Sequence, residues 1–385
     1  MMEAYIVSAA RTPGGRRKGY LAGVHPADLG ATALDAVVER AGIDPQLIDD
    51  VIVGCVTKAG EQSFAIGRST VLASRLIPDS VPAMTIDRQC GSSQQAVSFA
   101  AQGVMSGTQD IVIAAGVESM TRVPMASDFS LHAKAGIGEG PWSKTILEKY
   151  GVSEFSQFVG AQMIADKWGF SRADMDAFAL ESHRRAAAAI NAGAFDQEFV
   201  QVFADSNQQD EGVRFDASME SMGALDPIID GGSITAANAS QMCDGSAAIM
   251  VVSEAALKRH NLTPIARVHS FTVTGGDPVM MLAEPINATR KVLKRAGMTL
   301  NDIGLFEVNE AFASVPMAWL KELDVDPAKL NVNGGAIALG HPLGASGAKL
   351  MTTMIYALKA RGLRYGLQTM CEGGGTANAT IIEAL

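Results

Sequence analysis

The chain contains the stretch Ala36-Val37-Val38-Glu39-Arg40-Ala41-Gly42, and a similar stretch, Lys291-Val292-Leu293-Lys294-Arg295-Ala296-Gly297, follows 255 positions later. The same offset, carried forward without gaps, superposes further pairs: Ile48 on Ile303, Val53 on Val308, Gly107 on Gly362, and the strand 110–116 on 365–371. A register that persists over about seventy positions indicates two copies of one structural unit. We expect the two copies to pack about a pseudo-twofold axis.

The pattern of apolar residues predicts an α/β fold with a largely buried sheet. Predicted strands cover residues 4–9, 51–55, 111–115 and 248–252, and predicted helices cover 31–41, 96–106, 172–192 and 286–296. Residues 118–243 match neither copy and contain glycine-rich loops near 136–151. Long insertions in compact domains usually carry binding functions. We therefore expect three parts: an N-terminal half (1–117 plus 244–265), an inserted loop domain (118–243) and a C-terminal half (266–385).

Composition narrows the class of protein. The chain has 385 residues, 48% of them apolar, and a net charge of −10, which argues against nucleic acid as the main partner. No apolar run is long enough to span a bilayer, and no signal peptide is recognisable at the N-terminus. The four cysteines show no Cys-x-x-Cys spacing, so we expect neither a metal site nor a disulfide framework. These features predict a reduced, cytoplasmic protein.

Cys90 stands where an extended segment gives way to a helix, in Ile86-Asp87-Arg88-Gln89-Cys90-Gly91-Ser92-Ser93. A thiol in the first turn of a helix is close to unpaired N–H groups and to the positive end of the helix dipole. Both favour the thiolate, which is the nucleophilic form of cysteine. The alternative is that Cys90 is a small buried apolar residue, as most free cysteines are.

Three further segments complete a candidate catalytic site. The offset places Cys90 on Ala345, so the helix starts of the two copies should face each other and bring His341 towards Cys90. Cys371 ends the last strand of the second copy, and the N–H groups of the glycines after it, including Gly373, could stabilise an oxyanion. Asn309 follows a strand and could orient a carbonyl or a water. Each has an ordinary alternative: a structural histidine, a tight turn and a helix N-cap.

Together these segments resemble the thiolase family over the whole chain. The matching motifs are Ala10-Arg11-Thr12-Pro13, Cys90 with its helix, Asn309-Glu310-Ala311-Phe312, Gly340-His341-Pro342 and Cys371-Glu372-Gly373-Gly374-Gly375. The resemblance implies a duplicated α/β core with an inserted loop domain, and acyl transfer between coenzyme A thioesters. It implies no permanently bound cofactor, coenzyme A as substrate, and a homodimer or homotetramer.

The resemblance also implies a role for each site residue. Cys90 is the nucleophile that takes the acyl group, His341 is the base that activates it, and Cys371 is the acid/base for the acetyl-CoA enolate. Asn309, through a water, and His341 form one oxyanion hole. The N–H groups of Cys90 and Gly373 form the other.

The loop domain supplies the remaining implied residues. Arg214 matches a basic contact to the nucleotide end of coenzyme A, and Ser240 matches a serine on the pantetheine arm. Phe158-Val159 stands where short-chain biosynthetic members carry His-Met. Since valine is smaller than methionine, we expect an acyl pocket wider than acetoacetyl-CoA needs. The stretch 87–95 resembles a bacterial degradative branch that includes members acting on steroid breakdown products.

The sequence thus predicts a 3-ketoacyl-CoA thiolase that acts mainly in the degradative direction. An acetoacetyl-CoA-forming acetyltransferase and a non-catalytic lipid-binding relative are the alternatives within the family. A ketoacyl synthase would need a second histidine where Cys371 stands. A Cys-His thioesterase would not pass the acyl group to coenzyme A.

Overall fold

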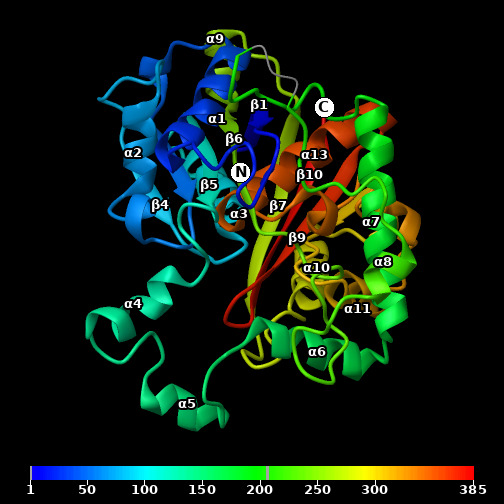
Figure 1. Ribbon diagram of the computed structural model, residues 1–385. Helices are drawn as coiled ribbons and strands as arrows, with labels where there is room; N and C mark the ends of the chain where they lie inside the picture. Colours follow the sequence, from blue (N-terminus) through cyan, green and yellow to red (C-terminus); the bar gives the residue numbers. More distant parts are fainter. Residues whose placement is uncertain (1, 205–207) are drawn as a thin grey trace.

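The computed structural model describes residues 2–204 and 208–385, and the sheet they form runs through the whole molecule (Figure 1). The strand order is β4-β3-β5-β6-β1-β7-β10-β9-β8, and β2 pairs with β6 beside this path. The strands are β1 (Ala4–Arg11), β2 (Gly15–Arg16), β3 (Asp50–Gly54), β4 (Ala83–Ile86), β5 (Ile111–Ser119), β6 (Cys243–Ser253), β7 (Ala266–Gly275), β8 (Leu305–Val308), β9 (Tyr365–Glu372) and β10 (Thr376–Ala384).

Helices cover both faces of this sheet. They are α1 (Pro26–Ala41), α2 (Ile66–Ala73), α3 (Ser92–Ser106), α4 (Ser127–Ala135), α5 (Lys144–Tyr150), α6 (Gln157–Trp168), α7 (Arg172–Asn191), α8 (Met219–Gly223), α9 (Glu254–His260), α10 (Pro285–Ala296), α11 (Ser314–Leu323), α12 (Ala336–Leu339) and α13 (Ser346–Arg361). Among the described residues, no helix is long and apolar enough to cross a membrane.

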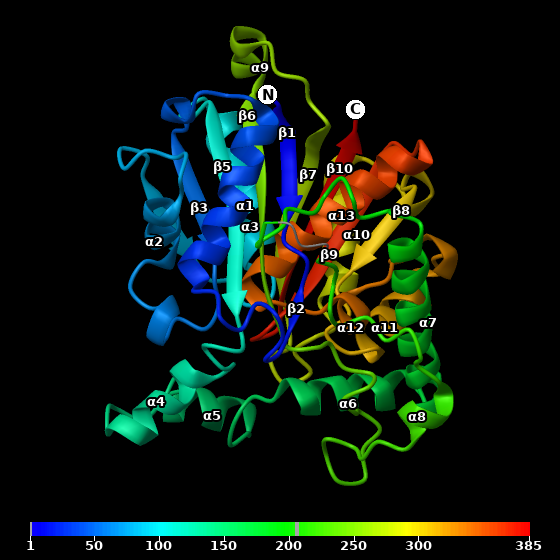
Figure 2. The same cartoon turned by 45° about the horizontal axis from the view of Figure 1, so that its top comes forward.

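Alternation along β5 shows how the layers form. Ile111 and Ile113 pack in one apolar cluster with α1, whereas Val112 and Ala114 pack in another with α3 and α13. Successive side chains of a strand point to opposite faces, so β5 is buried on both sides. Helices α3 and α13 contact strands of both halves of the chain and form the central layer (Figures 1 and 2).

The structure confirms the duplicated α/β core. Helices α1 and α3 recur as α10 and α13, and the parallel pair β3–β5 recurs as β8–β9. Helices α3 and α13 pack against each other, and the hydroxyl of Ser93 accepts a hydrogen bond of 2.8 Å from the N–H of Ala348, which lies 255 positions further on. Two positions related by the repeat therefore touch, and the helix starts of the two copies meet there.

The offset of 255 does not hold in strand β9, which is followed by one more strand, β10. Val53 pairs with Ala115 in the first copy, but Val308 pairs with Thr369 in the second, which corresponds to an offset of 254 for this strand. The reason is a shorter connection, because β9 starts sooner after Gly362 than β5 starts after Gly107. Our superposition of 110–116 on 365–371 is therefore wrong by one residue.

Two predicted elements are longer than their apolar runs. Strand β6 begins at Cys243 rather than at residue 248, because the polar Asp244 and Ser246 are buried in it and hydrogen-bonded. Helix α1 begins at Pro26, where the side chain of His25 accepts a hydrogen bond from the N–H of Ala27. Both residues suit a helix N-terminus, because His25 caps a free N–H group and Pro26 is favoured in the first turn.

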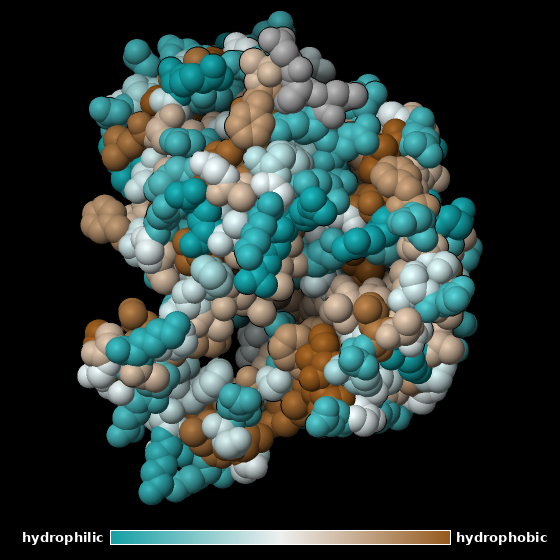
Figure 3. Space-filling model, viewed as in Figure 1, coloured by the Kyte–Doolittle hydropathy of each residue, from teal (hydrophilic) through white to brown (hydrophobic). Residues whose placement is uncertain are grey.

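The segment between β5 and β6 leaves and returns at the same end of the sheet, because these two strands are antiparallel neighbours. Helices α4 and α5 form an arm that extends from the body of the molecule (Figures 1 and 2). None of residues 124–159 is buried. Beyond the arm, α6 packs on α11 and α7 packs on α12, so this part rests on the C-terminal half. In Figure 3 apolar residues gather where the arm meets α6.

Candidate active site

Cys90 lies in the turn between β4 and α3. The helix starts at Ser92 with Gly91 as its N-cap, so Cys90 precedes the helix and does not lie in its first turn as we expected. Gln89, just before it, has a φ of 48°, a conformation that is strained for a residue with a side chain. The Ser92 hydroxyl holds this turn by donating to the carbonyl of Gln89 (2.6 Å).

The surroundings of Cys90 do not favour its thiolate, contrary to our expectation. Burial raises the pKa of Cys90 well above its ordinary value, and the nearby Cys371 and Glu372 raise it further. The N–H groups at the helix start are engaged within the turn, because those of Gly91 and Ser92 donate to backbone carbonyls. Cys90 is therefore a thiol in this structure, and a base is needed to remove its proton.

His341 has the geometry of such a base. Its Nδ1 lies 2.5 Å from the hydroxyl of Ser346, and that hydroxyl donates to the carbonyl of Pro342 (2.8 Å). The hydroxyl must therefore accept a hydrogen bond from Nδ1–H, which leaves the lone pair on Nε2. Burial and the charge of Lys349 lower the pKa of His341 to about 3, so the ring is neutral at physiological pH.

Asn309 connects His341 to Cys371. Its Nδ2 lies 3.4 Å from Nε2 of His341, and its side chain lies close enough to the thiol of Cys371 to lower the pKa of that thiol. Cys371 is fully buried at the end of β9, and burial raises its pKa to about 12. Cys90 and Leu343, two residues after His341, share one apolar cluster. The structure thus brings both cysteines, the histidine and the asparagine into one place.

Gly373 belongs to the turn between β9 and β10 and lies against Gln89. A Cβ at Gly373 would be 3.0 Å from Oε1 of Gln89, the residue before Cys90. The glycine turn after Cys371 therefore borders the turn that carries Cys90. The next two glycines have a φ of 83° and 77°, which explains why the turn contains glycine.

The residues predicted to line the acyl pocket and to bind coenzyme A differ in their exposure and in their contacts. Phe158 packs edge-on against Phe312 with ring centres 5.7 Å apart, and Val159 beside it is 44% exposed. Ser240 is tied to the site, because its N–H donates to the carbonyl of Ala311 (2.9 Å). Arg214 is exposed, and its N–H donates to His183 on α7 (3.1 Å) rather than to the cysteine cluster.

Two buried carboxylates, which the sequence pattern did not single out, hold the loop that carries His341. Glu118 accepts from the N–H of Gly344 at 2.9 Å and from two N–H groups of the loop after β3. Glu310 accepts from the N–H of Ile337 at 3.1 Å. A charged residue that follows an uninterrupted apolar strand, as Glu118 follows Ile111–Val117, is the sequence signal for such a role.

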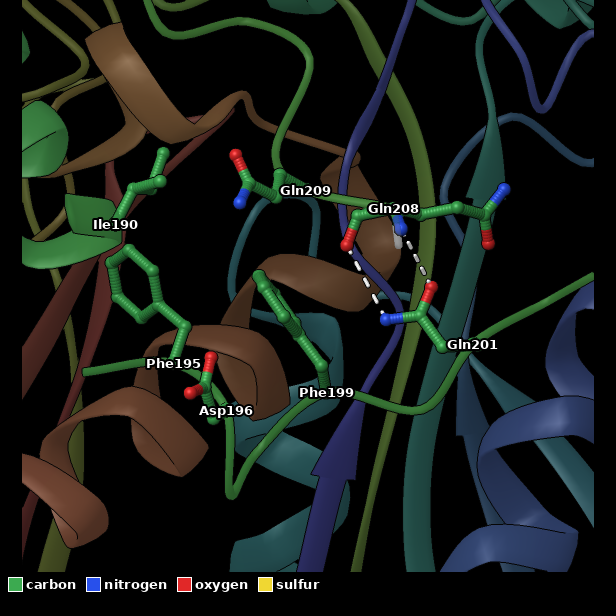
Figure 4. A pocket seen from close by; sticks show the side chains of 7 residues that line it. All are labelled: Ile190, Phe195, Asp196, Phe199, Gln201, Gln208 and Gln209. Carbon is green, nitrogen blue, oxygen red and sulfur yellow. Dashed lines mark hydrogen bonds between the residues drawn. The ribbon is translucent and has the colours of Figure 1, made fainter. Parts of the chain in front are cut away.

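Two hollows lie near helix α7, away from the cysteines. Figure 4 shows one beside α7, lined by Ile190, Phe195, Asp196, Phe199, Gln201, Gln208 and Gln209. It has no thiol and no histidine. Another lies between α7 and α11. Among the described residues, no group of three or more acidic, cysteine and histidine side chains is placed to hold a metal ion.

The site combines two buried thiols, a buried neutral histidine and a buried asparagine on a duplicated α/β core. Residues 4–255 match the N-terminal domain of thiolases, and residues 262–384 match the C-terminal domain. The chain therefore belongs to the thiolase family and is an acyltransferase.

The relatives agree in length with this chain. It is 52% identical over 388 residues to the steroid 3-ketoacyl-CoA thiolase FadA6 of Mycobacterium tuberculosis, covering 100% of this chain and 95% of the relative. It is 40% identical to a 3-ketoacyl-CoA thiolase of Bacillus subtilis, with full coverage of both. The crystal structure of the Bacillus anthracis acetyl-CoA acetyltransferase superposes with a TM-score of 0.90 at 36% identity, covering 100% of this chain and 99% of that one.

Proposed function

We propose that this enzyme cleaves 3-ketoacyl-CoA with coenzyme A, through an acyl-Cys90 intermediate, to acetyl-CoA and a shortened acyl-CoA. The observation that carries the proposal is the continuous contact from Cys371 through Asn309 to His341, with Cys90 beside it. A simple thioesterase needs one thiol and one base. Cleavage of a carbon–carbon bond also needs an acid for the departing carbanion, and a second thiol supplies it.

In the first half-reaction Nε2 of His341 takes the proton of Cys90, and the thiolate attacks the 3-keto carbon. The bond between C2 and C3 then breaks, and the acetyl-CoA enolate takes a proton from Cys371. In the second half-reaction the Cys371 thiolate takes the thiol proton of coenzyme A, whose sulfur attacks the acyl-Cys90 thioester. The shortened acyl-CoA is released, and the departing Cys90 thiolate takes its proton back from His341. Asn309, through a water, and His341 stabilise one oxyanion, and the N–H groups of Cys90 and Gly373 stabilise the other.

For the substrate we propose a bulky 3-ketoacyl-CoA, including ring-containing ones that arise in steroid breakdown. Support comes from the steroid 3-ketoacyl-CoA thiolase of Mycobacterium tuberculosis at 52% identity. Val159, smaller than the methionine of short-chain members, is consistent with a wider pocket. Turnover of acetoacetyl-CoA and of a cyclic 3-ketoacyl-CoA should differ clearly in favour of the cyclic one. Comparable rates, or condensation of acetyl-CoA as the faster reaction, would support the acetyltransferase alternative instead.

Mass spectrometry of Cys90 tests the reaction. Incubation with a 3-ketoacyl-CoA should leave an acyl group on Cys90 and release acetyl-CoA, and the absence of both would refute the proposal. Cys371→Ala should still be acylated at Cys90 by a preformed acyl-CoA but should not condense acetyl-CoA. Cys243→Ala is the matched control, because it also removes a buried thiol.

We further propose that Arg214 and Ser240, in a loop domain of residues 118–243, bind coenzyme A.

We also propose that the enzyme is a cytoplasmic homodimer or homotetramer. The edge strand β4 supports assembly, because β3 is its one partner among the described strands and it carries Met84 at 46% exposure. Phe64, in the connection between β3 and α2, is 92% exposed. Unpaired edges with exposed apolar residues favour pairing with another chain. Sedimentation of the wild type and of Met84→Lys would show whether this edge forms the interface.

A further inference from the structure

We propose that Glu372 is a positioning residue of this site, whose charge state controls how readily Cys90 gives up its proton. The neutral carboxyl permits the thiolate, and the ionised carboxylate opposes it. The inference rests on the proposed function only in taking Cys90 as the nucleophile. It adds to the reaction a titratable group that none of the catalytic steps uses.

The position of Glu372 carries this proposal. Glu372 follows Cys371 at the end of β9 and has no exposed surface. One carboxyl oxygen, Oε2, accepts a hydrogen bond from the hydroxyl of Thr376 (2.6 Å). The other, Oε1, is buried and has no hydrogen-bond partner among the described residues. A Cβ placed on Gly91 would be 2.0 Å from Oε1, so this oxygen lies against the residue that follows Cys90.

The neighbouring groups do not neutralise this carboxyl. Arg88, in the turn before α3, is the cation whose charge reaches it, but Nε of Arg88 and Oε1 of Glu372 are both without a hydrogen-bond partner among the described residues. The amide of Asn378 on β10 donates to the carbonyl of Gly91 (3.0 Å). The remaining titratable neighbours are Cys371 and Cys90 themselves.

A second carboxylate, Glu118, also faces Cys90 but is held differently. It accepts hydrogen bonds from three backbone N–H groups and from the side chain of Gln62. Such donors stabilise a carboxylate, whereas Glu372 keeps one oxygen without any. Burial raises the pKa of both carboxyls, but the donors to Glu118 oppose that rise, whereas no donor to Oε1 opposes it in Glu372.

The pKa values allow its effect to be isolated. Burial raises the pKa of Glu372 to about 8, while His341 titrates near 3 and Cys371 near 12. Glu372 therefore changes charge beside Cys90 between pH 6 and pH 10, a range in which His341 and Cys371 keep their protonation states, and Glu372→Gln separates its effect from that of Glu118. Below pH 7 its neutral form leaves Cys90 unaffected. Above pH 9 its negative charge reduces the thiolate fraction of Cys90.

The test is the rate of Cys90 alkylation by iodoacetamide between pH 6 and pH 10, followed by mass spectrometry of the Cys90 peptide. In the wild type the logarithm of the rate should rise with pH, flatten near pH 8 and rise again. Glu372→Gln should rise without this break. Its rate should equal that of the wild type at pH 6.5 and exceed it about tenfold at pH 9.5, which corresponds to one pKa unit.

Two further variants make the test specific. Glu307→Gln removes a different buried carboxyl, neither oxygen of which has a hydrogen-bond partner among the described residues, and it should keep the wild-type break. Thr376→Val removes the donor to Oε2 and should move the break to higher pH, but should have no such effect in a Glu372→Gln background. Superimposable profiles of wild type and Glu372→Gln, or loss of the break in Glu307→Gln, would overturn the inference. Alkylation needs no 3-ketoacyl-CoA, so the result does not depend on whether cleavage is observed.

Discussion

Replacing Gly347 by alanine should separate the two central helices. Gly347 lies in the first turn of α13, and a Cβ there would be 2.2 Å from the backbone nitrogen of Gln94 in α3. Ordinary contact begins at 3.4 Å, so the helices would have to move apart by about 1.2 Å. In an exposed helix the same substitution stabilises by about 1 kcal/mol. Here overpacking should outweigh that gain and destabilise the protein by roughly 1–3 kcal/mol.

The rate of Cys90 acylation should fall as well. Helix α3 begins two residues after Cys90, so its displacement moves the nucleophile relative to His341. A misplacement of about 1 Å can cost on the order of 100-fold in rate. We expect this loss in single-turnover acylation of Cys90, alongside urea unfolding for the stability. Gly23→Ala is the control, because nothing lies within 4 Å of its added Cβ. A Gly347→Ala enzyme that is more stable than wild type and is acylated normally would refute this reasoning.

Three other changes test the buried charges. Arg11→Met should cost about 3–5 kcal/mol in urea unfolding, because it removes the guanidinium that pairs with the buried Glu198 and Asp210 and leaves Asp210 with Lys349 alone. Glu372→Gln should gain stability relative to wild type by up to about 1.4 kcal/mol per pH unit between pH 4.5 and 8, since a raised carboxyl pKa loses stability as pH rises. His183→Gln should lose less stability than wild type from pH 6.5 down to 4, because burial lowers the pKa of His183 to about 4 and its protonation opposes folding. If Glu372→Gln or His183→Gln unfolds with the same pH dependence as the wild type, the prediction for that variant is wrong.

The sequence predicted the duplicated core because a repeat preserves the order and spacing of whole elements. It could not reveal the shorter connection before Tyr365, because one missing residue in a loop leaves every apolar run intact. The gathering of Cys90, His341, Asn309 and Cys371 followed from the repeat and from the family motifs.

The protonation state of the site was beyond the sequence. A residue pattern places a thiol near a helix start, but the pKa depends on burial and on which N–H groups remain free. Ser346, which fixes the tautomer of His341, is an ordinary helix residue in the sequence. Glu118 and Glu310 act through backbone groups of distant loops, so the position of Glu118 after an apolar strand marks it as unusual but does not reveal which loop it holds.

The contact between Ser93 and Ala348 has an evolutionary consequence. The pseudo-twofold axis of the two copies passes between these equivalent residues. A site beside this axis is therefore built from residues of both halves. A dimer of two identical single units would have to carry the nucleophile, the base and the acid in every copy. Fusion of the units into one chain removes that requirement, and here the first half keeps Cys90 while the second has Ala345 in its place and supplies His341 and Cys371. Gene duplication thus allowed one symmetric scaffold to divide its chemistry between two diverging copies.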